Sequence, residues 1–165
     1  MSKKTLRQEL IRLLRVNARM PESEMADRLR VSVETVQQTI AEMEQEGIIM
    51  GYGTLVNEEK LDGTSVRAII EVEVQPERDG GFDRVARLIS RFSEVKAVYL
   101  VSGRYDLRLE VVGESLQEVA SFVASKLAPL QGIKSSDSHF LLKKYKEAGF
   151  KLHEEEEYER LPIVP

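Results

Sequence analysis

The sequence predicts an α+β protein, with a helical N-terminal unit followed by a unit in the order β-α-β-β-α-β. Two observations predict this class. Apolar residues recur at helical spacing from Leu6 to Met43, and segments rich in β-branched residues alternate with amphipathic segments between Val66 and Leu142. A chain of 165 residues has room for one domain or two small ones.

Three helices are predicted in the N-terminal unit. The first begins near Leu6, the second is a short helix of about two turns after Pro21, and the third runs from Val33 to Glu46. Ser32 is a favoured N-cap for the third helix, and Gly47 is a favoured residue just past its end. The apolar residues that define the helices are Leu6, Leu10, Leu13, Leu14, Met25, Ala26, Leu29, Val33, Val36, Ile40 and Met43.

The segment after the third helix predicts a small hairpin. Ile48 and Ile49 form a short extended piece, glycines at 51 and 53 favour a turn, and a second extended piece ends at Val56. Three helices followed by such a wing are typical of a winged helix-turn-helix, whose last helix enters the major groove of DNA. A helical packing module with no DNA function is the alternative at this point.

The second unit is predicted to be a ferredoxin-like sandwich. Strands are expected over 66–74, 95–101, 107–111 and 133–142, and helices over 82–92 and 116–127. This order forms one antiparallel sheet with two helices on one face. The uncovered face of so small a domain is commonly buried against a second copy, so we expect a homodimer through this unit.

Composition and charge place the domain boundaries and exclude several protein classes. The predicted domains are a winged helix-turn-helix over 1–56, a polar linker over 57–64, a ferredoxin-like domain over 65–146 and an acidic tail over 147–165. The chain lacks cysteine and has two histidines, His139 and His153, so no disulfide, thiolate or histidine-rich site is expected. No run approaches the roughly 18 apolar residues of a spanning helix, and no signal peptide is apparent. We expect a soluble, cytoplasmic protein with no metal, cofactor or catalytic residue.

Several short motifs, in this order and spacing, resemble the Lrp/AsnC family of transcriptional regulators of bacteria and archaea. The resemblance extends from about Leu6 to Tyr145. Its most specific element is the turn Ser102–Leu107, which is similar to the family's G-x-Y-D turn between the two middle strands. The other segments that carry it are Asn17–Arg19, Glu24–Ala26, Val31–Ser32, Met43–Ile49 and Gly51–Tyr52.

The resemblance implies a second domain that forms dimers, which assemble further into tetramers or octamers, and that binds an amino acid or related effector. By position, the implied effector-binding residues are Gly103, Arg104, Tyr105, Asp106, Ser136 and Ser138. In chemical terms Asp106 can hold an α-ammonium, while turn N–H groups and serine hydroxyls can hold an α-carboxylate. The alternative is that Gly103 supplies a turn conformation and that Asp106 anchors the turn through backbone hydrogen bonds.

The third helix departs from the family pattern. Relatives usually carry arginines on its exposed side, whereas residues 33–46 contain no Lys or Arg and include Glu34, Glu42, Glu44 and Glu46. Such a helix attracts phosphates weakly. Residues 1–30 instead contain eight basic residues against four acidic ones. We therefore expect phosphate contacts from the second helix and base contacts from the third. The predicted residues for double-stranded DNA are Arg19, Arg28, Arg30, Ser32, Glu34, Thr35, Gln37 and Gln38.

The sequence thus favours a sequence-specific transcriptional regulator that responds to an amino acid-like effector. Two alternatives remain open. One is a ligand sensor or hetero-oligomer partner with weak DNA binding, which the acidic third helix favours. The other is an enzyme that resembles sirohaem decarboxylases, for which His139 is the only well-placed imidazole. No nucleotide-binding or zinc-protease motif is present to support an enzyme.

Overall fold

The computed structural model describes residues 2–61, 65–76 and 81–152, and the chain divides into two compact units, Met1–Val56 and Asn57–Pro165. The part of the predicted linker over 62–64 and the acidic run Glu154–Glu157 lie outside the described residues. Each unit has its own apolar core, so each is described by itself below.

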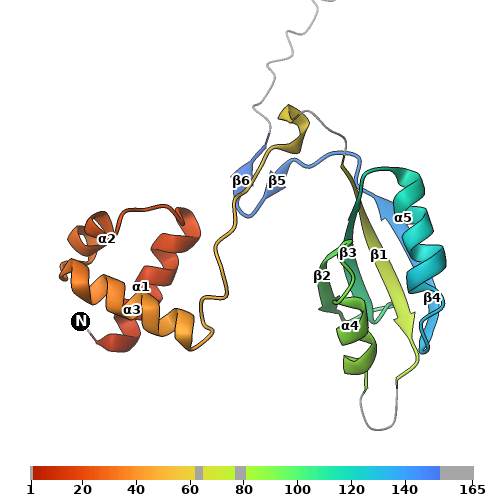
Figure 1. Ribbon diagram of the computed structural model, residues 1–165, viewed down its shortest axis with the longest axis horizontal. Helices are drawn as coiled ribbons and strands as arrows, with labels where there is room; N and C mark the ends of the chain where they lie inside the picture. The colour runs from red at the N-terminus through yellow and green to blue at the C-terminus, as the bar shows by residue number, and fades with distance from the viewer. Residues whose placement is uncertain (1, 62–64, 77–80, 153–165) are drawn as a thin grey trace, which may run out of the picture. The chain divides into compact units, whose positions relative to one another are not determined.

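The first unit consists of three helices, as predicted: α1 (Lys3–Val16), α2 (Glu22–Leu29) and α3 (Val33–Gln45) (Figure 1). Helix α1 begins one turn earlier than its first apolar residue because the Ser2 hydroxyl accepts a hydrogen bond from the Thr5 N–H. The apolar stripes of the three helices meet in one core of Leu6, Leu10, Leu13, Met20, Met25, Ala26, Val36 and Met43.

The predicted hairpin after α3 is wrong, because the described residues 48–56 contain no strand. The chain leaves α3 through Gly47, whose φ of +69° lets the Ile48 and Ile49 N–H groups both donate to the Met43 carbonyl. Beyond this point Met50 and Tyr52 are exposed. Two short extended pieces separated by glycines bury too little side chain to hold a two-stranded ladder by themselves.

The second unit has the predicted β-α-β-β-α-β order, with one antiparallel sheet of strand order β2-β3-β1-β4. Figure 1 shows α4 and α5 over the same face of this sheet. Helix α5 continues into one π-helical turn, Val123–Leu127. The elements are β1 (Val66–Val74), α4 (Asp83–Ile89), β2 (Val95–Leu100), β3 (Leu107–Gly113), α5 (Leu116–Phe122) and β4 (Ile133–Phe140).

Strand register separates an apolar face from a charged one. Ile70 lies opposite Leu109, and Val72 opposite Leu107, and all four side chains are buried under the helices. Their sequence neighbours point to the other face, where Glu71 lies opposite Arg108. Neither helix covers this second face, which we call the open face.

The second unit also contains a small hairpin that the sequence analysis assigned to the acidic tail. Strand β5 (Lys146–Glu147) pairs with β6 (Phe150–Lys151) through a turn at Ala148 and Gly149, both with positive φ. Hairpin turns of this kind favour Asn-Gly or Asp-Gly, so Ala-Gly gave no signal. The amide of Asn57, the first residue of this unit, donates to the Leu152 carbonyl just after the hairpin.

Among the described residues, no helix has the length and apolar character needed to cross a membrane.

The buried face of the sheet should dominate the stability of the second unit. Leu109 is 0% exposed and Leu142 is 97% exposed. Replacing Leu109 with Ala should lower the free energy of unfolding by about 2–5 kcal/mol, because it leaves a cavity between the sheet and the helices. The same change at Leu142, a matched control, should alter it by no more than about 0.5 kcal/mol. Urea unfolding measures both, and equal effects would contradict the assignment of the core face.

Candidate functional site

The turn between α2 and α3 is the first feature of the candidate DNA site. Helix α2 ends at Arg30, which has a left-handed conformation with φ +56° and ψ +47°. Its N–H donates to the carbonyls of Ala26 and Asp27, while Ser32 caps α3 by accepting from the Thr35 N–H. A left-handed conformation costs a residue other than glycine about 1 kcal/mol. The arginine is therefore held where glycine would be the easier choice for the backbone.

Helix α3 presents its predicted base-reading residues to solvent. Glu34, Thr35, Gln37 and Gln38 are all exposed, whereas Val36, Thr39 and Met43 pack on the opposite side. The Gln37 amide donates to Glu22 of α2 at 2.6 Å, so one of its donors is already used within the protein. The Gln38 side chain makes no hydrogen bond within the described part of the chain, and its whole amide is available to a base.

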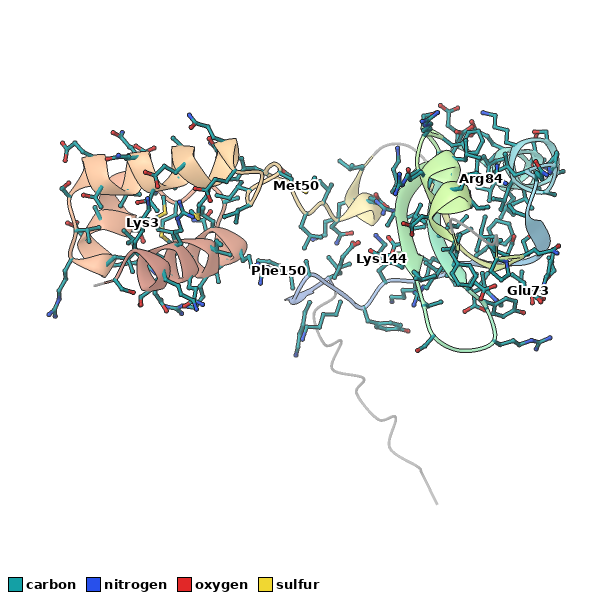
Figure 2. All side chains as sticks on the ribbon, turned by 90° about the horizontal axis from the view of Figure 1, so that it is seen from below. Lys3, Met50, Glu73, Arg84, Lys144 and Phe150 are labelled. Carbon is teal, nitrogen blue, oxygen red and sulfur yellow. The ribbon has the colours of Figure 1, made fainter. Side chains whose placement is uncertain are left out.

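Helix α1 neutralises two of the four glutamates of the third helix region. Arg7 bonds Glu46 at 2.7 and 2.8 Å and Glu42 at 3.1 Å. Lys3, labelled in Figure 2, pairs with Glu42 at 2.8 Å. Hydrogen bonds from Lys3 and then Arg7 lower the pKa of Glu42, and those from Arg7 lower the pKa of Glu46. Sequence analysis missed this network. The signal was present, because Lys3 and Arg7 are four residues apart, as are Glu42 and Glu46, and this spacing aligns side chains along a helix.

The two other glutamates differ in their surroundings. Glu44 accepts a hydrogen bond from the Tyr52 hydroxyl at 2.7 Å, and desolvation together with this bond raises the pKa of Tyr52 to about 12. A hydrogen bond from its own backbone N–H, and then one with Ser32, lowers the pKa of Glu34. Glu34 is therefore a carboxylate, exposed at the start of α3.

The predicted phosphate-binding arginines fall into two groups. Arg28 is engaged by Glu24 of the same helix at 2.6 Å. Within the described residues Arg19 and Arg30 form no ion pair, and both side chains are exposed. These two guanidinium groups are thus free to meet a phosphate without first breaking an internal contact.

The turn before β3 is the candidate effector site. Gly103 has a φ of +134°, which favours glycine. One carboxylate oxygen of Asp106 accepts the Val74 N–H at 2.8 Å, and the Asp106 N–H donates to the Val72 carbonyl at 3.1 Å. Asp106 therefore anchors the turn to the end of β1, while its second carboxylate oxygen accepts no hydrogen bond from the described residues.

The structure brings the turn against β4 at a residue that sequence analysis missed. The Tyr105 hydroxyl donates to Asp137, and this bond raises the pKa of Tyr105, whose ring lies 5.5 Å from the Arg104 guanidinium carbon. Asp137 lies opposite Glu71 on the open face. Its alternation with serines in the strand gave no signal for this role, because only the fold places it beside the turn.

The two predicted serines lie on the other side of β4 from Asp137. Ser136 lies opposite Val72 and Ser138 opposite Ile70, which places both hydroxyls on the helix-bearing side of the sheet. The six predicted effector residues are therefore not gathered on one face. His139, on the open face, is 62% exposed and lies 3.6 Å from Glu71.

In the part of the chain that the structure describes, no group of three or more His, Cys, Asp or Glu side chains is placed to hold a metal ion.

Two protein-family models match the chain. Residues 4–50 match a winged helix-turn-helix DNA-binding model, and residues 67–149 match the Lrp/AsnC ligand binding domain. The HTH-type transcriptional regulator YugG of Bacillus subtilis is 38% identical over 158 residues, 95% of each chain. Regulatory protein AsnC of Haemophilus influenzae is 31% identical over 134 residues, covering 81% of this chain and 87% of AsnC.

Solved structures share the fold. Escherichia coli AsnC has a TM-score of 0.67 at 24% identity, covering 87% of this chain and 94% of AsnC. The transcriptional regulator NMB0573 of Neisseria meningitidis, solved as a complex with L-Met, has a TM-score of 0.69 at 22% identity, covering 86% of this chain and 91% of that one.

The ion pairs between α1 and α3 should make the first unit sensitive to acid. The lowered pKa values of Glu42 and Glu46 mean that their stabilising effect is complete above the ordinary glutamate pKa of about 4.3. It is then lost as the pH falls through their lower folded-state values. Thermal unfolding followed by helical circular dichroism between about pH 6 and about pH 3 measures this loss.

The double variant Glu42→Gln, Glu46→Gln should show a shallower fall in melting temperature over that range. The variant Glu114→Gln, at an exposed position in the second unit, is the control and should follow the parent protein. Identical pH profiles for all three proteins would show that the network does not stabilise the fold.

Proposed function

Because the chain belongs to the Lrp/AsnC family of helix-turn-helix transcriptional regulators, we propose that it reads a specific DNA sequence and that an amino acid bound to its second unit controls this binding. The family consists of DNA-binding regulators with a ligand-binding regulatory domain, and its members are not enzymes. The observation that carries the DNA proposal is Arg30, a cation kept in a strained backbone conformation at the turn between α2 and α3.

The backbone conformation of Arg30 supports a role in binding. Strain of this kind persists where the side chain is needed, and nothing in the fold uses this one, because Arg30 is exposed and forms no ion pair within the described residues. In a helix-turn-helix, the helix before the turn crosses the phosphate backbone. Arg30, together with Arg19, is thus suited to phosphates.

The exposed start of α3 is suited to base recognition. Gln38 has a free amide that can pair with adenine in the major groove, and Thr35 can contact a thymine methyl. Glu34 is ionised and can accept a hydrogen bond from a cytosine amino group, while it repels phosphates. Glutamate next to glutamine and threonine therefore favours contact with base edges over contact with the backbone.

The acidic character of α3 is a weaker objection to DNA binding than the sequence suggests. Two of its glutamates are neutralised by Lys3 and Arg7 on the side facing α1. This weakens the alternative of a ligand sensor or hetero-oligomer partner with weak DNA binding in one respect, since the acidic character of the third helix favoured it; the helix still carries no Lys or Arg. Several modules on one assembly can further strengthen weak binding through effective concentration.

The turn before β3 that contains Gly103 and Asp106, called the ligand turn below, favours an α-amino acid as the effector class. The free carboxylate oxygen of Asp106 and the exposed carboxylate of Asp137 are two acceptors for an ammonium group, and Arg104 supplies a cation for a carboxylate. The Neisseria relative was solved with L-Met, which belongs to the same chemical class. Ser136 and Ser138 lie on the other face of β4 from Asp137, so they would contact an effector only from that side of the strand.

We also propose that the second unit joins copies of the chain into a homodimer, with tetramers or octamers as higher states. Its open face, which includes Tyr99, Ile69 and Val112, has no helix over it. A second copy would cover these side chains and pair charges such as Glu71 and Arg108 across the interface.

Binding to the chain's own upstream DNA across a salt series tests the regulatory function. Replacing Arg30 with Gly should weaken binding and lower the slope of log affinity against log salt concentration by about one, because one phosphate contact is lost. The free energy of unfolding should change by less than about 1 kcal/mol, since relief of strain offsets the greater freedom of the unfolded chain. The control Arg87→Ala removes an exposed cation from the second unit and should leave the slope unchanged. No binding by the parent protein at low salt would overturn the proposal.

Amino acid binding to the ligand turn can be separated from anchoring of the turn by the conservative change Asp106→Asn. Asparagine keeps an oxygen for the Val74 N–H but removes the charge that would hold an ammonium. In a thermal-shift screen of amino acids, a ligand at 100 times its Kd should stabilise the parent protein by about 2.7 kcal/mol, and the variant should bind it about tenfold more weakly. The control Asp83→Asn lies on α4 and should behave as the parent. Equal binding by all three proteins would leave Asp106 as an anchor only.

A further inference from the structure

A cavity lies within the first unit, where the end of α1, helices α2 and α3 and the segment after α3 meet. Its volume is about 310 Å³, at the lower end of the range of small-molecule sites. All of its lining residues belong to Met1–Val56, so the cavity is complete within one unit, and we call it the helical cavity. The lining residues are Leu14, Ala18, Met20, Glu22, Met25, Gln37, Ile40, Ala41, Glu44 and Tyr52.

The floor of the helical cavity is apolar. Met20 and Met25 are only 7% and 1% exposed, and the half-buried Leu14 and Ile40 pack against the same core. Methionine side chains are flexible and polarizable, so they adapt to the shape of a bound group. The floor is therefore suited to the aliphatic part of a ligand.

The rim of the helical cavity carries two carboxylates. Glu22, at the start of α2, and Glu44, in the last turn of α3, are both exposed. Neither pairs with a Lys, Arg or His side chain among the described residues, whereas Glu42 of α3 is held by Arg7. Two carboxylates beside one cavity repel each other, and a bound cation would relieve this repulsion.

The hydrogen bonds of the rim leave mainly acceptors for a ligand. The Tyr52 hydroxyl donates its one proton to Glu44 at 2.7 Å, and the Gln37 amide donates to Glu22 at 2.6 Å. The Tyr52 oxygen can therefore only accept a further hydrogen bond. Desolvation, the bond with Glu44 and the charges of Glu44 and Glu22 raise the pKa of Tyr52 to about 12. Both carboxylates thus act on the same part of the rim.

We propose that the helical cavity binds a small organic amine, with its ammonium group at the carboxylates of Glu22 and Glu44 and its aliphatic body against the apolar floor. An ammonium has three donors and no acceptor, which matches this rim. Its hydrogen bonds to carboxylates are about twice as strong as bonds between neutral groups.

The proposed ligand differs from the effector of the ligand turn. Among the residues that line the helical cavity in the described part of the chain there is no lysine, arginine or histidine. The carboxylate of an amino acid would therefore meet no cation there and would be repelled by Glu22 and Glu44. The cavity favours an amine that carries no acidic group.

Methionine methyl groups report binding at this place in the full chain. Met20 and Met25 line the cavity, whereas Met43 lies in the same core without lining it and Met50 is 95% exposed. Titration of hexylamine into protein with isotope-labelled methionine methyl groups, followed by nuclear magnetic resonance, should shift the signals of Met20 and Met25 and leave the other two in place. Hexylamine should bind about tenfold more tightly than butylamine, because two more methylene groups are buried.

Two further probes with the same aliphatic body test the charge. Hexanol replaces the ammonium by a hydroxyl, and aminoheptanoate is hexylamine with a carboxylate on the carbon that bears the nitrogen. Each should bind in the helical cavity at least about tenfold more weakly than hexylamine, because the first loses the charge-assisted hydrogen bonds and the second adds repulsion.

The double variant Glu22→Gln, Glu44→Gln keeps an acceptor oxygen for each hydrogen bond of the rim but removes both charges. It should weaken hexylamine binding at least about tenfold and leave hexanol binding unchanged. The control Glu9→Gln, Asp27→Asn removes the same number of charges from α1 and α2 outside the cavity and should bind hexylamine as the parent protein does.

Four outcomes would overturn the proposal. Equal binding of hexylamine and hexanol would show an apolar cavity without an ammonium site, and unchanged hexylamine binding by the double variant would show that the carboxylates take no part. Shifts at Met43 and Met50 as large as those at Met20 and Met25 would place the amine elsewhere, and no shift at all would exclude binding. The hexylamine titrations contain no DNA, so they succeed or fail independently of the regulatory function proposed above.

Discussion

The alternation of side chains along β1 is the constraint on which most of the second unit depends. Ala68, Ile70, Val72 and Val74 are fully buried, so a slip of one residue in register would turn this apolar set to solvent and charged residues into the core. The same alternation fixes what lies on the open face. Glu71 and Arg108 are held there because their neighbours are buried, and Asp137 is held there because β4 pairs in register with β1, opposite Glu71.

The open face thus carries two different chemistries at its two ends. At the end of β1, backbone anchoring by Asp106 and the contact between Tyr105 and Asp137 gather carboxylates suited to an ammonium group. Toward the start of β1, Arg67 is already paired with Glu58, so the charges there are neutralised within the chain.

In the first unit, pairing between helices decides how the charges act. The glutamates of α3 that face α1 are bound by Lys3 and Arg7, so they contribute to holding the helices together and little to repelling DNA. The exposed surface near the turn then consists of Arg19, Arg30 and the polar start of α3. An acidic helix is compatible with DNA recognition when its cations come from the neighbouring turn and its contacts are made to bases.

The sequence by itself determined the order of elements and the core of each unit, because alternation and helical spacing are local properties that survive in any context. The resemblance to the family came from short motifs, above all the turn Ser102–Leu107. It predicted the hairpin after α3 wrongly, because two short extended pieces near Gly51 form a ladder only with enough packing. Only the tertiary structure decided which charges meet. The partners of Arg7 and Asp137 lie far from them in the chain, and helix packing and strand register, which no local pattern specifies, bring them together.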